Sequence, residues 1–168
     1  MIVQGFRVDE TIPDEWWVMD YYNVKSEKDL EEIRSALNTV RLDEKTIDSV
    51  IETLKHPNTG YTLTINKLST SIIVMSTAYN QSEFFDTFAH ELKHLTDHIG
   101  SAFGFRQDSE ESAWLQGELS KNMYKVIRRL MCKNDGQYIG NIARNRHPDD
   151  DSNSILASGE KEISRRSR

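Results

Sequence analysis

The chain of 168 residues has few of the features that stabilise small secreted proteins or carry a chain across a membrane. It contains one cysteine, Cys132, so neither an intramolecular disulfide nor a cysteine-based metal site is expected. No apolar run approaches the roughly 20 residues that span a bilayer, and residues 1–5 lack the pattern of a secretory signal. We therefore expect a cytoplasmic protein that does not bind membranes.

Positive charge is also scarce. The 21 Lys and Arg residues are outnumbered by 27 Asp and Glu residues, the net charge is −6, and no basic stripe dominates the sequence. This balance argues against nucleic acid as a partner. The length is sufficient for one domain with a core, which we place at residues 1–132. Residues 133–168 lose apolar periodicity, and we interpret them as a polar, extended or mobile tail. Nothing in the sequence indicates an oligomeric state.

The apolar residues that are present follow helix and strand patterns. Ser26 and Asp29 are typical of a capped helix start, and alternating residues around a polar turn predict an antiparallel hairpin. The pattern predicts strands near 6–8, 16–22, 61–66 and 71–76, the last of them continuing to residue 80, and helices over 26–40, 43–54, 82–99 and 108–131. We therefore predict an α+β fold, in which a small antiparallel sheet is packed with a motif-bearing helix and a long second helix.

The helix predicted over 82–99 carries the motif His90-Glu91-Leu92-Lys93-His94. Histidines four residues apart lie on one face of a helix, so both imidazoles can reach one metal ion. Glu91 is offset from His90 by roughly 100° around the axis, which places its carboxylate beside the metal, where it can accept a proton from a bound water. The motif therefore predicts a Zn²⁺ site with His90 and His94 as ligands and Glu91 as the catalytic base.

A catalytic zinc ion usually has three protein ligands. His98 shares the face of the two histidines but lies one further turn along the axis, so it better suits the lining of a cleft or an oxyanion. Glu110 and Glu111 open the next predicted helix, and Glu110 heads a strip of small residues formed by Ala113, Gly117 and Ser120. Such a strip favours close helix packing, so Glu110 is the preferred third ligand and Glu111 the alternative.

The motif, the short linker and the glutamates at the start of the next helix resemble the gluzincin metallopeptidases. Residues 108–115, Asp-Ser-Glu-Glu-Ser-Ala-Trp-Leu, are similar to the small minigluzincin-like peptidases of phages and bacteria, and the resemblance spans about residues 62–124. It implies zinc held by His90, His94 and a glutamate of the second helix. It also implies that residues 76–80 form an edge strand that pairs with an extended peptide substrate.

The function that we predict is zinc-dependent hydrolysis of peptide bonds in peptide or protein substrates, through a zinc-bound water that Glu91 activates. His98 and Tyr124 are candidates for stabilising the oxyanion. Asp86 and Asp97 each lie one turn from a predicted ligand histidine and could support it. Lys93 is charged where the family pattern prefers an uncharged residue, which leaves an alternative function, that of a zinc-binding but inactive peptidase-fold adaptor of a phage or toxin system. In a third interpretation, the chain is a helical interaction protein with incidental histidines.

Overall fold

The computed structural model describes the backbone of residues 1–144 and the side chains of residues 1–131. The chain divides into two units, residues 1–131 and 132–168. The first unit has four strands and two pairs of helices, with the strands in the order β1-β2-β4-β3. The elements are β1 (Ile2–Val8), β2 (Trp16–Val24), α1 (Glu27–Thr39), α2 (Glu44–Leu54), β3 (Gly60–Ile65), the 3₁₀ turn η1 (Asn66–Leu68), β4 (Thr70–Ser76), α3 (Gln81–Ala102) and α4 (Glu110–Arg144).

The predicted α+β class is confirmed, but the prediction of a purely antiparallel sheet is wrong. The pairs β1–β2 and β3–β4 are antiparallel, and the second of these is the predicted hairpin. The central pair β2–β4 is parallel, with Met19 opposite Ile72. Parallel strands require a long crossover connection, and α1, α2 and β3 supply it here. The sheet is therefore mixed, with β1 and β3 at its edges.

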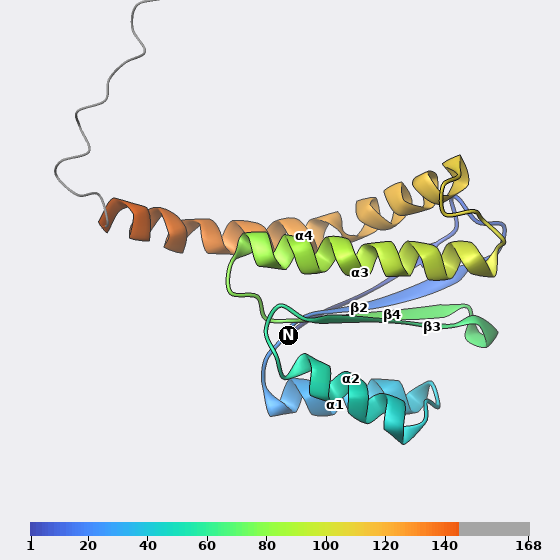
Figure 1. Ribbon diagram of the computed structural model, residues 1–168, viewed down its shortest axis with the longest axis horizontal. Helices are drawn as coiled ribbons and strands as arrows, with labels where there is room; N and C mark the ends of the chain where they lie inside the picture. Colours follow the sequence, from blue (N-terminus) through green and yellow to red (C-terminus); the bar gives the residue numbers. More distant parts are fainter. Residues whose placement is uncertain (145–168) are drawn as a thin grey trace, which may run out of the picture. The chain divides into compact units, whose positions relative to one another are not determined.

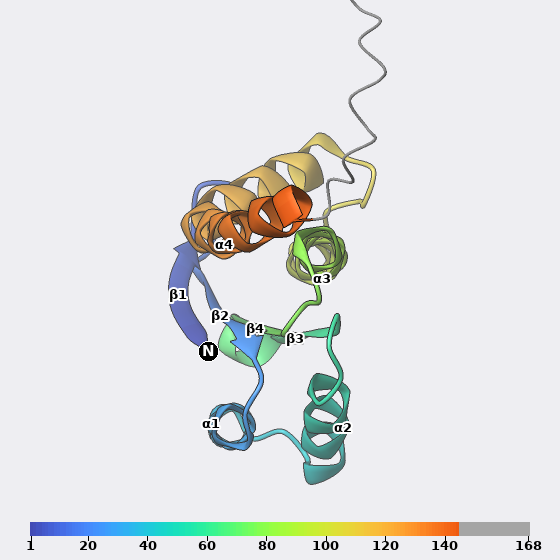
Figure 2. The same ribbon diagram turned by 90° about the vertical axis from the view of Figure 1, so that its left-hand side faces the viewer.

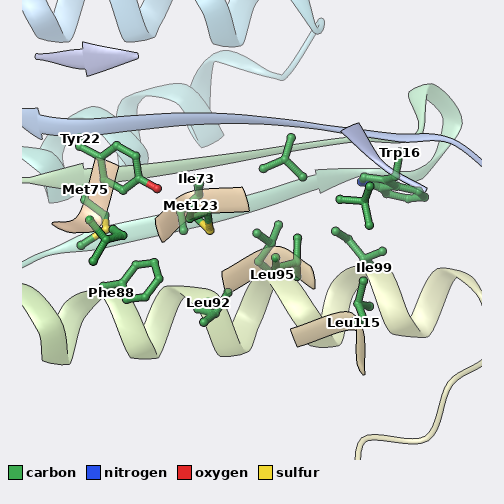
Figure 3. Packing of buried hydrophobic residues seen from close by; sticks show 14 of the residues in the cluster. Trp16, Tyr22, Ile73, Met75, Phe88, Leu92, Leu95, Ile99, Leu115 and Met123 are labelled. Carbon is green, nitrogen blue, oxygen red and sulfur yellow. The ribbon is translucent and has the colours of Figure 1, made fainter. Parts of the chain in front are cut away.

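Helices cover both faces of the sheet. Figures 1 and 2 show α1 and α2 on one face and α3 with the first part of α4 on the other. Side chains alternate between the two faces of a strand, so neighbours in β4 enter different cores: Ile73 packs under α3 and α4, whereas Ile72 packs against α1 and α2. Figure 3 shows the larger core, in which Leu95 and Ile99 of α3 are fully buried between the sheet and α4.

Polar caps define where the helices begin. The Ser26 side chain accepts a hydrogen bond from the backbone N–H of Asp29, and the Asp29 carboxylate accepts one from the backbone N–H of Ser26, which is the predicted capping box. Asp43 and Asn80 cap α2 and α3 through single side-chain oxygens. These caps satisfy N–H groups that have no partner within the helix.

The end of α3 differs from the prediction, which ended this helix at residue 99, just before Gly100. The helix continues to Ala102, and Gly104 is the residue with a positive φ, +74°. The N–H of Gly104 donates to the carbonyl of Ser101, and the N–H of Phe105 donates to the carbonyl of Gly100. This pair of bonds closes a helix at a left-handed residue, where glycine avoids the steric penalty of a Cβ atom. Gly104, rather than Gly100, therefore terminates α3.

Helix α4 extends beyond its predicted end. Its backbone is helical to Arg144, although the sequence pattern predicts no regular structure after residue 132. The rest of the predicted tail, residues 145–168, lies outside the described residues. In the part of the chain that the structure describes, every helix is too short or too polar to serve as a membrane span.

A buried carboxylate ties α4 to the loop between β1 and β2. Glu118 accepts backbone N–H bonds from Asp9 and Glu10 at Oε1, 2.9 and 3.0 Å, and from Thr11 at Oε2, 2.9 Å. Burial alone would raise the pKa of Glu118, but the bonds from Glu10, Asp9 and Thr11 outweigh burial and lower it. One side chain thus satisfies three loop amides that would otherwise lack partners.

A second buried acid, Asp20 on β2, has no such support. Its Oδ2 accepts a 2.7 Å hydrogen bond from the Tyr22 hydroxyl, whereas its Oδ1 is buried without a partner among the described residues. Burial raises the pKa of Asp20 to about 6 from its ordinary value of 3.8. The ionised form is therefore unfavourable in the folded protein.

We expect replacement of Asp20 by Asn to stabilise the protein at high pH. The folded-state pKa is raised, so the cost of burying the ionised Asp20 carboxylate grows as the pH rises from about 4 to 6 and is fully present above pH 6. The difference between the two pKa values corresponds to about 3 kcal/mol, an upper estimate for the gain of Asp20→Asn at pH 8. Urea denaturation at pH 8 and pH 5 measures it, with exposed Asp14→Asn as the control. An Asp20→Asn gain that is equal at both pH values would contradict the prediction.

Replacement of Glu118 by Gln has the opposite pH dependence. The amide offers one acceptor oxygen to three N–H groups, so we expect a loss of about 1–3 kcal/mol of unfolding free energy at pH 7. The pKa of Glu118 is lowered from 4.5, so the wild-type advantage is present above pH 4.5 and disappears as the pH falls through the folded-state pKa. Chemical denaturation against pH measures the loss. The same substitution at exposed Glu31 should cost little at any pH.

Candidate metal centre on helix α3

The two histidines of the motif are brought together on the exposed surface of α3. The Nε2 atoms of His90 and His94 are 3.1 Å apart, and the ring centroids are 4.7 Å apart at an angle of 79°. Two nitrogens bound to one tetrahedral zinc ion at 2.0–2.1 Å are separated by about 3.3 Å. The imidazole pair therefore fits a zinc ion in both donor type and spacing.

Glu91 points to a different side of the helix from the two histidines. Its side chain is 5% exposed, and its Oε2 accepts a 2.7 Å hydrogen bond from the Thr62 hydroxyl on β3. The same hydroxyl lies 3.2 Å from the backbone carbonyl oxygen of Glu91. Along the helix, Glu91 is offset by roughly 60° from His94, so its carboxylate lies between the imidazole pair and the edge strand.

His98 is the third histidine on this flank of α3. Its ring centroid is 6.0 Å from that of His94, with the planes inclined at 35°. Partial burial of the ring lowers the pKa of His98, and the neighbouring His94 lowers it further. His98 is therefore placed beside the pair. Tyr124, the other oxyanion candidate, is 58% exposed and lies on α4 outside the face that packs on α3.

Among the described residues, Glu110 forms no metal-binding group with the two histidines. It is an exposed residue at the first position of α4, beyond the loop that follows α3, and Ala102 lies about 12 Å along the helix from His94 at 1.5 Å per residue. Leu115 of α4 approaches Gly100, which is 180° around α3 from Glu91. Helix α4 therefore packs on the flank of α3 opposite Glu91.

The predicted small-residue strip does not mediate this helix packing. Ala113 and Gly117 are exposed, and a Cβ atom added at Gly117 would meet nothing within 4 Å. The contact with α3 is made instead by the buried apolar residues Leu115, Leu119, Met123 and Ile127. The argument that favoured Glu110 over Glu111 therefore loses its basis. Both residues are exposed, and a backbone N–H bond and the Ser109 hydroxyl lower the pKa of Glu111.

Asp97 and Asp86 were the acids predicted to support the ligand histidines. Both oxygens of Asp97 accept from the Lys93 ammonium group at 2.5 Å, which links the charged residue of the motif to the next turn. Asp86 is exposed. Among side chains 1–131, no group of three or more His, Cys, Asp and Glu residues converges as a metal site. The two histidines are thus the part of the predicted ligand set that the structure brings together.

The edge-strand prediction is wrong about which segment is free. Ser76 ends β4, which is a central strand, and residues 77–80 are not a strand. Three of their backbone groups already have partners: the Thr77 N–H donates to the Val24 carbonyl, the Thr77 carbonyl accepts from the Asn58 N–H, and the Tyr79 N–H donates to the Asn58 side chain. The edge beside Glu91 is β3 instead.

Sequence reasoning did not identify Gly60 or Thr62 of β3 as part of this site. An ideal Cβ atom at Gly60 would lie 2.4 Å from Cγ and 2.8 Å from Oε1 of Glu91. Thr62 was recognisable only as a polar residue in an alternating strand. Comparison with known proteins gives no further guide, because no family model, no curated protein and no solved structure matches the chain.

Proposed function

We propose that the protein is a zinc-dependent metallopeptidase whose site lies between α3 and β3. The observation that carries the proposal is the 3.1 Å separation of the His90 and His94 Nε2 atoms. His90 and His94 would hold the ion, and the candidates for the third ligand are Glu110 and Glu111 at the start of α4. A bound zinc ion would acidify a water molecule and polarise a substrate carbonyl.

Glu91 is the proposed base. It directly follows the first ligand, and its carboxylate lies roughly 60° around α3 from His94, against Thr62 of β3. In hydrolysis it would accept a proton from the attacking water at a carboxylate oxygen and return it to the leaving amine. His98 beside His94 is the better of the two candidates for donating to the developing oxyanion, because Tyr124 lies on α4.

An extended peptide is the substrate that this arrangement suits. Strand β3 is the last strand of the sheet beside α3, so one edge of its backbone is not paired with another strand of the sheet. A peptide can add to such an edge through main-chain hydrogen bonds. It would then run past Thr62, whose side chain touches Glu91. We therefore assign the pairing with an extended peptide to β3, and not to residues 76–80 as predicted from the sequence.

A second function is favoured by the burial of Glu91. A carboxylate that is 5% exposed and bonded to Thr62 also suits a structural link between α3 and β3. In that case the protein would bind zinc without cleaving peptides, as an inactive peptidase-fold adaptor. The two functions share the metal and differ in whether Glu91 performs chemistry.

Zinc content tests the site itself. We expect the purified protein to retain about one zinc ion per chain after dialysis, and His90→Ala or His94→Ala to lose it, because each removes a coordinating nitrogen. Metal analysis by mass spectrometry measures the content. His56→Ala, which removes an exposed histidine after α2, is the matched control, and Glu110→Ala and Glu111→Ala test the third ligand. Unchanged zinc in His94→Ala would rule out the site.

Peptide cleavage separates the enzyme from the adaptor. We expect zinc-loaded wild-type protein to cleave a broad peptide library, and Glu91→Gln to lower kcat by at least about 100-fold, since general-base catalysis contributes 10²–10⁴-fold. Zinc content should stay the same in the variant. Mass spectrometry of the library before and after incubation gives the result. A library left intact by fully zinc-loaded wild-type protein would favour the adaptor and reject the peptidase.

A further inference from the structure

Strand β3 holds the side chain of Glu91 by a hydrogen bond. The Thr62 hydroxyl has one proton, and the 2.7 Å distance to Oε2 of Glu91 is shorter than the 3.2 Å distance to the backbone oxygen. The Thr62 hydroxyl therefore donates chiefly to the Glu91 carboxylate. This bond restrains the rotation of a side chain that has three rotatable bonds.

Strand β3 also supplies the space in which Glu91 lies. A Cβ atom at Gly60 would be 2.4 Å from Cγ, 2.8 Å from Cδ and 2.8 Å from Oε1 of Glu91. The φ angle of Gly60 is outside the left-handed region, so the requirement is for room and not for an unusual backbone. Any larger residue at this position would displace the carboxylate from Thr62.

We propose that Gly60 and Thr62 are positioning residues for Glu91, and that β3 thereby aligns the base on the strand that would receive the peptide. The inference rests on the proposed peptidase function. Gly60 leaves room beside Oε1 of the carboxylate, and the Thr62 hydroxyl donates to Oε2. A base must be held within hydrogen-bond reach of the water that it deprotonates. The hydrogen bonds of the Thr62 hydroxyl and the atoms nearest to Gly60 all belong to Glu91, so we expect the two residues to act on Glu91 and not on metal binding.

The test compares four variants by kcat, KM and zinc content. We expect Thr62→Val to lower kcat by roughly tenfold or more, because a hydrogen bond to a charged group is lost, with zinc and KM within about twofold of wild type. Thr62→Ser keeps the hydroxyl and should restore most of kcat. Gly60→Ala should lower kcat at least as much as Thr62→Val. Thr64→Val is the matched control, since the Thr64 hydroxyl pairs with Ser71 and not with Glu91.

Wild-type kcat in Thr62→Val and Gly60→Ala would overturn the proposal, as would an equal loss in Thr64→Val. A double-mutant cycle separates this failure from failure of the peptidase function. If zinc-loaded wild type cleaves nothing, the urea midpoints of Thr62→Val, Glu91→Ala and the double variant still test the contact. Non-additive midpoints support the positioning of Glu91 by β3, and additive midpoints reject it.

Discussion

The structure depends on the burial of the central strands β2 and β4 from both sides. Each of these strands has apolar side chains on both faces, and their backbones pair with neighbours on both edges. A strand of this kind requires cover on both faces. The α1–α2 pair covers one face, and α3 with the first part of α4 covers the other. The position of the motif helix is a consequence of this requirement.

The candidate site lies on the part of α3 that is packed neither on the sheet core nor against α4. Helix α3 buries the arc containing Leu92, Leu95 and Ile99 in the core, and α4 packs beside Gly100. The flank that is left carries His90 and His94 at the surface and Glu91 against β3. The edge strand β3, the Glu91 carboxylate and the imidazole pair of His90 and His94 therefore lie next to one another in this order. This order links the fold to the proposed chemistry.

Local signals in the sequence predicted much of the fold. Ser26 with Asp29, and the alternation in residues 61–66, act over a few residues, so the first helix and the hairpin were identifiable. The parallel pairing of Met19 with Ile72 joins segments about fifty residues apart, and no local pattern encodes it. The antiparallel prediction was wrong for that reason.

The candidate site was predictable to a similar extent. His90 and His94 lie together because helix geometry alone places residues four apart on one face. The Thr62–Glu91 contact depends on which strand lies at the edge of the sheet. The prediction gave the edge to residues 76–80, whereas the structure has β3 there. Gly117 shows a further limit: a small residue suits close packing and open solvent equally, and here it faces solvent. The small side chains of Ala113 and Gly117 therefore could not decide between Glu110 and Glu111 as the third zinc ligand.

The hydrogen bonds from the β1–β2 loop to Glu118 couple local unfolding of this loop to the separation of α4. The amides of Asp9, Glu10 and Thr11 belong to a loop, yet each is bonded to the buried carboxylate of Glu118 in the first part of α4. Their hydrogen exchange with solvent therefore requires α4 to separate from the loop, rather than the loop to fluctuate alone. Three loop amides thus report on the detachment of a helix more than a hundred residues away in the chain.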